Sequence, residues 1–230
     1  MGKNYRNEWK YCCPDYYLTQ LISRLENFLE PDCNASDDYY RVRTLYFDDI
    51  NSSCAMSVNA GASKRFKYRL RYYDDNISTL HFERKEKLFG RCRKFISSVS
   101  TVECNLLCNG DVWPVFWGND NDYLKKFCVD IISKSFSPKI ITDYERKAYV
   151  DENLNIRITI DKNIFVSKDI ENFLDGVYDL MPIQNTNWHI LEIKFDEILP
   201  KYIMDIINMR CLNQTSFSKY YIGRQKLMRV

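Results

Sequence analysis

The stretch FKYRLRYYDD, residues 66–75, alternates large apolar side chains with basic ones. Lys67, Arg69 and Arg71 occupy every second position, and Phe, Tyr and Leu fill the positions between them. Because successive side chains of a β-strand point to opposite faces, the stretch predicts a strand with one cationic and one apolar face. Taken alone, the pattern favours a half-exposed antiparallel strand in water over a strand whose cations face a negatively charged ligand.

The same alternation recurs in five other stretches, and this repetition favours strands whose cations face a negatively charged ligand. They are LHFERKEK (80–87), GRCRKF (90–95), TDYERKAY (142–149), NIRITID (155–161) and ILEIKFD (190–196). The solvent face of an ordinary sheet mixes charges of both signs, whereas these faces repeat Arg and Lys with few carboxylates. We therefore expect an inverted barrel, with its apolar outer surface under helices and its lumen lined with charge.

Cations that face one another across a lumen repel strongly unless an anion lies between them, so the expected ligand is a polyanion. Arginine forks and lysine ammonium groups suit phosphate oxygens, and Glu192 is the candidate ligand for Mg²⁺ or Mn²⁺. Glu83 and Asp161 share the charged faces. For these two acids we favour pairing with neighbouring arginines over metal binding through water.

The composition is that of a globular protein, with 45% hydrophobic and 28% charged residues among 230. Without a linker or internal repeat, residues 1–230 are interpreted as one domain. A net charge of +2 is too small to indicate a nucleic-acid partner. The nine cysteines form no CxxC pair, and the sequence shows neither a signal peptide nor a membrane span. These features favour a cytoplasmic location with free thiols.

Hydrophobic periodicity predicts an α+β protein, mainly antiparallel β. Helices are expected at 14–30, 120–134, 200–212 and 216–228, with a short one after residue 48 capped by Asn51 or Ser52. Strands are expected at 40–47, 65–73, 79–87, 91–99, 140–150, 154–161 and 188–196. His81 and His189 are interpreted as structural, and the segment around Trp113 and Trp117 as packing or a lid.

These motifs together resemble the polyphosphate polymerase domain of the vacuolar transporter chaperone (VTC) family, within the triphosphate tunnel metalloenzyme superfamily. The resemblance rests on EWKY, TLYFDD, KYRLRYY, FERKEK, DYERKAY, RITID, LEIKF and FSKYYIG in this order across nearly the whole chain. It implies a CYTH-like tunnel barrel that transfers the γ-phosphoryl group of ATP or another nucleoside triphosphate to a growing polyphosphate chain. It also implies a divalent metal, Mn²⁺ or Mg²⁺, and leaves room for a separate membrane partner.

The resemblance assigns roles to individual residues. Catalytic roles fall to Arg69, Arg71, Lys85, Arg146, Arg157 and the metal ligand Glu192. Phosphate-binding roles fall to Lys10, Lys87, Arg93, Tyr144, Ser218 and Lys219, and Lys67 is added because it lines up with Arg69 and Arg71 on one strand face. Lys87 stands where the eukaryotic members have histidine, and the basic residue of the next strand is either Arg93 or Lys94.

Two other functions remain open at this stage. A metal-dependent triphosphatase of the same superfamily opens with an E-x-E-x-K strand. Here Glu8 and Lys10 fit that pattern, but Arg6 replaces the first glutamate, which favours the polymerase. A non-catalytic polyphosphate-binding module would not require Glu192.

Overall fold

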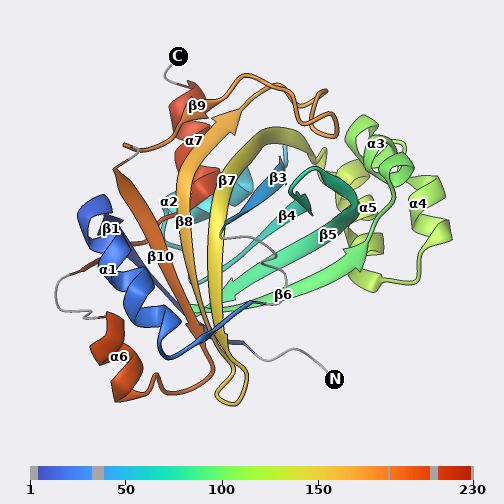
Figure 1. Cartoon of the computed structure of the whole chain (residues 1–230). Coiled ribbons are helices and arrows are strands. Elements are labelled where there is room, and N and C mark those ends of the chain that lie inside the picture. The colour runs from blue at the N-terminus through green and yellow to red at the C-terminus, as the bar shows by residue number, and fades with distance from the viewer. Residues whose placement is uncertain (1–4, 33–38, 186, 208–211, 229–230) are drawn as a thin grey trace.

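The computed structural model describes residues 5–32, 39–185, 187–207 and 212–228. One large antiparallel sheet dominates it, with strands in the order β11-β1-β10-β8-β7-β3-β4-β5-β6, while β2 pairs with β7 and β9 with β8 (Figure 1). The strands are β1 (Asn7–Pro14), β2 (Glu30–Pro31), β3 (Tyr40–Asp48), β4 (Lys64–Tyr73), β5 (Asn76–Leu88), β6 (Arg91–Ser98), β7 (Ser137–Asp151), β8 (Ile156–Ser167), β9 (Met181–Pro182), β10 (Trp188–Phe195) and β11 (Asn213–Gln214).

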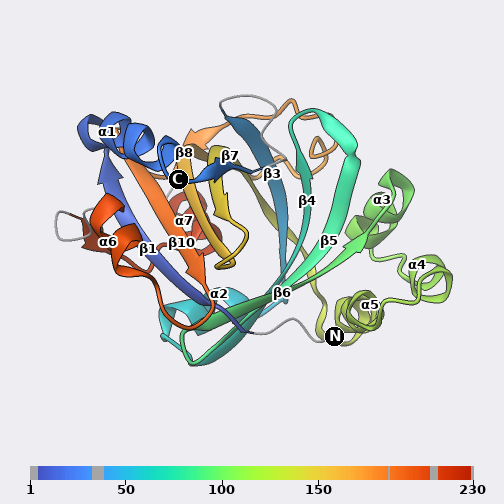
Figure 2. The same ribbon diagram turned by 60° about the horizontal axis from the view of Figure 1, so that its bottom comes forward.

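Helices pack on the outside of the curled sheet in two groups (Figure 2). One group is α1 (Asp15–Glu26) with α6 (Lys201–Ile207), and the other is α3 (Thr101–Asn109), α4 (Trp113–Gly118) and α5 (Asp122–Lys134). The short helix α2 (Ser53–Asn59) contacts β3 and β4, and α7 (Lys219–Met228) contacts α2, β7 and β8. This arrangement confirms the expected α+β fold, with helices over a mainly antiparallel sheet.

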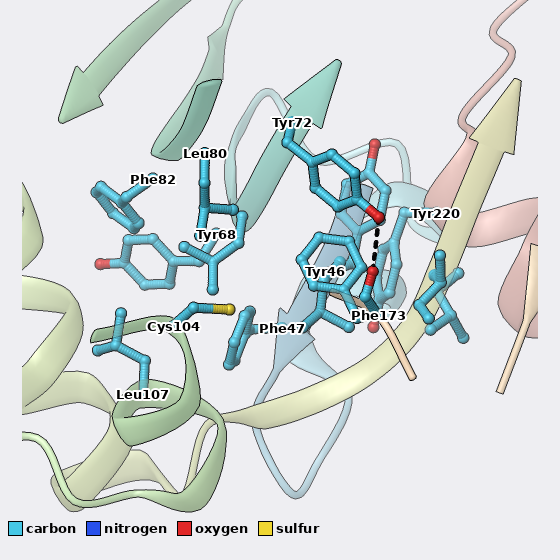
Figure 3. Packing of buried hydrophobic residues seen from close by; sticks show 14 of the residues in the cluster. Tyr46, Phe47, Tyr68, Tyr72, Leu80, Phe82, Cys104, Leu107, Phe173 and Tyr220 are labelled. Carbon is cyan, nitrogen blue, oxygen red and sulfur yellow. Dashed lines mark hydrogen bonds between the residues drawn. The ribbon is translucent and has the colours of Figure 1, made fainter. Parts of the chain in front are cut away.

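The apolar faces of the strands point outward into two hydrophobic clusters. Under α1 and α6, Leu21 and Ile203 pack with Ile158 and Ile193 of the sheet. On the other side, the apolar face of FKYRLRYY meets α3 and α5 (Figure 3), and Tyr72 donates a hydrogen bond of 2.7 Å to the carbonyl of Phe173. Burial of these faces under helices leaves the basic faces to line the interior, as the alternation predicts.

The sheet curls far enough for its two ends to touch, but it does not close into a continuous barrel. Arg6, just before β1, and Cys92 of β6 form one isolated antiparallel bridge, with N–H to O distances of 2.7 and 2.8 Å. Further along β1, β11 takes over the same edge, pairing Tyr11 with Gln214. The tunnel wall therefore has a seam between β1 and β6 that one pair of backbone hydrogen bonds holds.

Several expected elements differ in detail. The first helix ends at Glu26 instead of residue 30, and β8 continues to Ser167, past the expected end at 161. Ser52 does stand at the N-cap of α2, but its side chain caps nothing; carboxylates of Asp48 and Asp49 accept the free N–H groups instead. Helix α6 ends at Ile207 within the described residues, whereas residues 208–211 of the expected helix lie outside them.

Candidate functional site

The basic faces converge on one cavity of about 670 Å³ inside the curled sheet. Among the described residues, fourteen lysines and arginines line it, together with two carboxylates, Glu8 and Glu192. The cations are Arg6, Lys10, Arg65, Lys67, Arg69, Arg71, Lys85, Lys87, Arg93, Lys94, Arg146, Arg157, Lys194 and Lys219. Since the whole chain carries a net charge of only +2, positive charge is concentrated in this cavity and offset elsewhere. A concentration of positive charge of this kind attracts anions.

Glu83 of β5 is a fully buried carboxylate that organises cations of the two flanking strands, β4 and β6. Its Oε2 lies 2.5 Å from Nε of Arg69 and 3.6 Å from Nη1 of Arg71, and its Oε1 lies 2.7 Å from Nζ of Lys94. Burial opposes its ionisation, but Arg69 and Arg71 hold its pKa well below the usual range. Glu83 therefore pairs with arginines, the interpretation favoured from sequence, and fixes guanidinium groups at the cavity wall.

Asp161 of β8 does the same on the opposite wall. Arg146 binds it through two hydrogen bonds, from Nε to Oδ1 at 2.6 Å and from Nη2 to Oδ2 at 2.8 Å, and Lys219 also donates to it. The ring of Tyr144 lies against both cations, 5.3 Å from Cζ of Arg146 and 4.3 Å from Nζ of Lys219. Lys219, the first residue of α7, thus joins Tyr144 of β7 and Asp161 of β8, which are distant from it in sequence.

Glu8 and Glu192 form the acidic part of the cavity on β1 and β10. Lys10 lies between them, 3.1 Å from Glu192 and 3.8 Å from Glu8, while Lys85 and Lys194 hold their remaining oxygens at 2.6 and 2.5 Å. Burial and mutual repulsion would raise the pKa of Glu8, but the lysines lower it to about 2. The pKa of Glu192 is likewise held well below its usual range, against the effect of burial, chiefly by Lys194 and Lys10.

These two ionised carboxylates can supply only some of the ligands that a divalent metal ion needs. Within the described ranges, no group of three or more His, Cys, Asp or Glu side chains is arranged to hold a metal ion. Mg²⁺ and related ions, however, often take one or two carboxylates and complete their shell with water and substrate phosphates. The donor set of Glu192 and Glu8 therefore fits a metal that arrives with a phosphate ligand.

Lys67 of β4 and Tyr46 of β3 lie on adjacent strands and both line the cavity. The pKa of each side chain is lowered from its ordinary value. Burial, with Lys85 and Lys10 nearby, lowers the pKa of Lys67 to about 7, and its Nζ donates to Oγ of Ser218 at 2.7 Å. Burial would raise the pKa of Tyr46, but the surrounding cations lower it to about 7. A bound polyanion would favour the charged form of Lys67 and the neutral form of Tyr46.

The remaining sequence-predicted residues lie nearer the edges. Arg157 lines the cavity but is held by Asp32 at 2.6 Å and by the hydroxyl of Tyr40 at 3.2 Å. Lys87 lines the cavity beyond Lys85 on the same face of β5.

Of the two alternatives on β6, it is Lys94 that lies beside Glu83. Arg93 borders the cavity as well, but its guanidinium is bound by Glu86 at 2.7 Å and lies over the rings of Tyr5 and Phe95. Both residues line the cavity, so the phosphate-binding role expected for Arg93 stays a prediction, with Lys94 as the alternative that contacts Glu83. Trp113 and Trp117, left open as packing or a lid, lie in the exposed helix α4 and do not line the cavity.

Sequence reasoning assigned no role to several residues that the structure places in the cavity, among them Glu8, Lys194 and Tyr46. Lys194 could have been found, because it shares a strand face with Glu192. Glu8 was considered only in the comparison with triphosphatases, although its spacing from Lys10 puts both residues on one face of β1. Tyr46 carries no sequence signal beyond an alternating strand.

A family model, the VTC domain, matches residues 5–228. The chain belongs to the VTC domain family. Two solved structures with similar folds are HpAC1 from Hippeastrum, a candidate adenylyl cyclase described as having a dominant triphosphatase activity, and a candidate adenylate cyclase (bh2851) from Bacillus halodurans. HpAC1 is 12% identical with a TM-score of 0.55, covering 96% of each chain. The bacterial protein is 15% identical with a TM-score of 0.54, covering 95% of this chain and 96% of its own.

The search of curated proteins found no match. At these identities the two structures establish the fold alone, and with the VTC domain match they confirm the expected family and its CYTH-like tunnel fold. No helix in the described part of the VTC chain is long and apolar enough to cross a membrane.

Proposed function

We propose that this VTC domain is a polyphosphate polymerase. It transfers the γ-phosphoryl group of a nucleoside triphosphate to the end of a polyphosphate chain. The observation that carries this proposal is the concentration of fourteen cations in one cavity whose nearest acids are already paired with them. A ligand must supply several negative charges along its length to neutralise such a site, and a triphosphate or polyphosphate does so.

The chain's own residues act by positioning and by neutralising charge. Arg69, Arg71 and Arg146 hold phosphate oxygens from both walls, with Glu83 and Asp161 fixing their guanidinium groups. The terminal oxygen of the incoming chain forms a bond to the γ-phosphorus while the bond to the β–γ bridging oxygen breaks, and nucleoside diphosphate leaves. Phosphoryl transfer draws most of its rate from such positioning and electrostatic stabilisation. A divalent metal bound by Glu192 and Glu8 would neutralise further charge on the phosphate oxygens.

The protonation states of the acids favour transfer over hydrolysis. A chain end is already anionic at neutral pH and needs no base, whereas water must lose a proton. Glu8, with a pKa of about 2, and Glu192, whose pKa is also well below its usual range, are too weakly basic to accept that proton readily. The paired acids of this cavity therefore support the polymerase.

A metal-dependent triphosphatase is the second candidate, and one feature favours it. Glu8 and Lys10 reproduce part of the acidic entry strand of the hydrolytic relatives, and both reach the cavity. HpAC1, whose fold is similar, is described as having a dominant triphosphatase activity. A non-catalytic polyphosphate-binding module is the third candidate, since the same cations would bind the polymer without turnover.

The deciding experiment incubates the protein with ATP and Mn²⁺ and follows products by phosphorus NMR. The polymerase predicts signals of internal phosphoanhydride groups that accumulate as ATP is consumed. Removing one donor that stabilises charge in the transition state commonly lowers the rate about a hundredfold, so the rate of Arg69→Ala should fall by that factor. Glu192→Ala should abolish metal-dependent turnover. Arg41→Ala, on the outer face of β3, is the matched control and should keep wild-type activity.

The three candidates give different outcomes in this assay. Free phosphate as the sole product would replace the polymerase with the triphosphatase. Intact ATP with Mn²⁺ and with Mg²⁺, together with tight polyphosphate binding, would leave only the binding module.

A further inference from the structure

The interior face of β8 carries one short side chain between two long charged ones. Arg157, Thr159 and Asp161 follow one another at every second position, so they share a face, and Arg157 lines the cavity. Thr159 is directly opposite Glu192 of β10 on one side and Ala148 of β7 on the other. Residues directly opposite in an antiparallel pair have Cβ atoms about 4.5–5.5 Å apart. The side chain of Thr159 therefore lies beside the candidate metal ligand Glu192.

The hydroxyl of Thr159 is buried and has no hydrogen-bond partner among the described residues. The residue is 1% exposed, and its Oγ1 neither donates to nor accepts from any group in that part of the chain. The methyl group of Ala148, its neighbour on β7, can offer none. A buried hydroxyl without a partner lowers stability. The wall thus holds, next to a carboxylate, a donor that the ligand-free protein does not use.

Glu192 has to rearrange before it can bind a cation. Its Oε2 lies 3.1 Å from Nζ of Lys10, and its Oε1 lies 2.5 Å from Nζ of Lys194. Lys10 also donates to the carbonyl of Phe217 at 3.0 Å, whereas within the described ranges Lys194 forms its ion pair with Glu192 alone. A divalent cation repels both ammonium groups and needs a carboxylate oxygen. Lys194, with fewer partners, is the lysine that Glu192 exchanges for the ion.

We propose that Thr159 is a positioning residue for the metal ion. Once Glu192 has exchanged Lys194 for the ion, the Thr159 hydroxyl donates a hydrogen bond to the Glu192 carboxylate and holds it toward the cavity. The inference rests on the proposed function, because that function places a divalent metal at Glu192. Groups that hydrogen-bond a metal-binding carboxylate orient it, and their loss typically lowers metal affinity about 10- to 100-fold.

The test titrates Mn²⁺ into protein in excess over tripolyphosphate and follows water-proton relaxation, which detects Mn²⁺ immobilised on the protein. In Thr159→Val the Mn²⁺ concentration at half-saturation should rise about tenfold. The Kd for tripolyphosphate without metal, measured by calorimetry, should stay within about twofold of wild type, because the hydroxyl acts on the metal ligand and not on phosphate. Thr159→Ser keeps the hydroxyl and should restore Mn²⁺ binding.

Thr142→Val is the matched control. The hydroxyl of Thr142 on β7 is also buried and unpaired among the described residues, but the residue lies opposite Thr44 and Val166 instead of Glu192. This variant should bind Mn²⁺ as wild type does. An equal loss of Mn²⁺ affinity in Thr142→Val and Thr159→Val would overturn the inference, because the effect would then not depend on the place beside Glu192.

Urea denaturation without ligand distinguishes the proposed role from a structural one. Valine has a shape similar to that of threonine and removes an unpaired buried hydroxyl, so Thr159→Val should unfold at a urea concentration equal to or above that of wild type. A lower midpoint would indicate a hydrogen bond that Thr159 already makes in the free protein, and would overturn the inference.

Glu192→Gln separates failure of the inference from failure of the proposed function. Wild-type Mn²⁺ affinity in Thr159→Val, with a loss in Glu192→Gln, would overturn the inference and leave the proposed function standing. Wild-type Mn²⁺ affinity in Glu192→Gln would remove the metal site of the proposed function and the inference together.

Discussion

Neutralising Glu83 should destabilise the ligand-free protein, and a bound polyanion should restore much of the loss. Glu83 is fully buried and contacts Arg69, Arg71 and Lys94, so Glu83→Gln leaves two buried arginines and one half-buried lysine without their shared counter-charge. Removing one partner of a buried ion pair typically costs about 3–5 kcal/mol, and we expect a loss in that range. Glutamine keeps the shape and some hydrogen bonds, so the loss measures charge more than packing.

The assay is urea denaturation with and without tripolyphosphate. In wild type, saturating ligand raises the free energy of unfolding by the amount that its Kd and concentration dictate. In Glu83→Gln the anion also neutralises the cations that Glu83 no longer pairs, so the stabilisation by ligand should be larger than in wild type.

Glu86→Gln is the matched control, because Glu86 lies on the same strand but on the outer face. It pairs with Arg84 and Arg93 near the surface, where such pairs contribute about 1 kcal/mol or less. Its stabilisation by tripolyphosphate should equal that of wild type. A loss below about 1 kcal/mol in Glu83→Gln, or the same ligand effect in both variants, would refute the reasoning that buried cations of the cavity need an anion.

Further predictions follow from charge and protonation in the cavity. Lys67 has a pKa of about 7 in the free protein and should be held charged by a bound polyanion. Binding at pH 8 should then take up protons, and tripolyphosphate affinity should weaken as pH rises from 7 to 9. Calorimetry in buffers of different ionisation enthalpy measures this uptake, and zero uptake would contradict the assignment. Lys94→Ala should weaken tripolyphosphate binding about tenfold, whereas the Kd of Arg93→Ala should stay within twofold of wild type. Equal losses of affinity would indicate that Arg93 binds phosphate as well. Because several cations exchange counterions for the ligand, the Kd should rise steeply with salt concentration, and a flat dependence would argue for binding elsewhere.

The strand faces could be predicted from sequence because alternation has a period of two and is local. FKYRLRYY shows both faces within one strand, and burial under helices settles which face turns inward. The choice between Arg93 and Lys94 needed the phase of the next strand. The two-residue turn Phe89–Gly90, in which both residues have positive φ, sets that phase. As a result Lys85 of β5 pairs with Lys94 of β6. Directly paired residues share a face, so recognising this turn would have placed Lys94 on the same face as Lys85.

Other features depend on contacts between distant parts of the chain. The ion pair between Glu8 and Lys85 joins residues 77 positions apart, and no local pattern announces it. Predicting that Asp48 caps α2 requires knowing that the chain turns back immediately after β3. Helix α3 was missed although Ser100 and Glu103 form a capping box, a signal present in the sequence.

The central claim is that the cations of separate strands act together on one phosphate ligand inside the curled sheet. A crystal structure with tripolyphosphate and Mn²⁺ tests it most directly. We expect phosphate density between Arg69 and Arg71 on one wall and Arg146 on the other, with the metal beside Glu192. Tripolyphosphate bound only on the outer surface, with the cavity cations still paired to Glu83 and Asp161 alone, would contradict it.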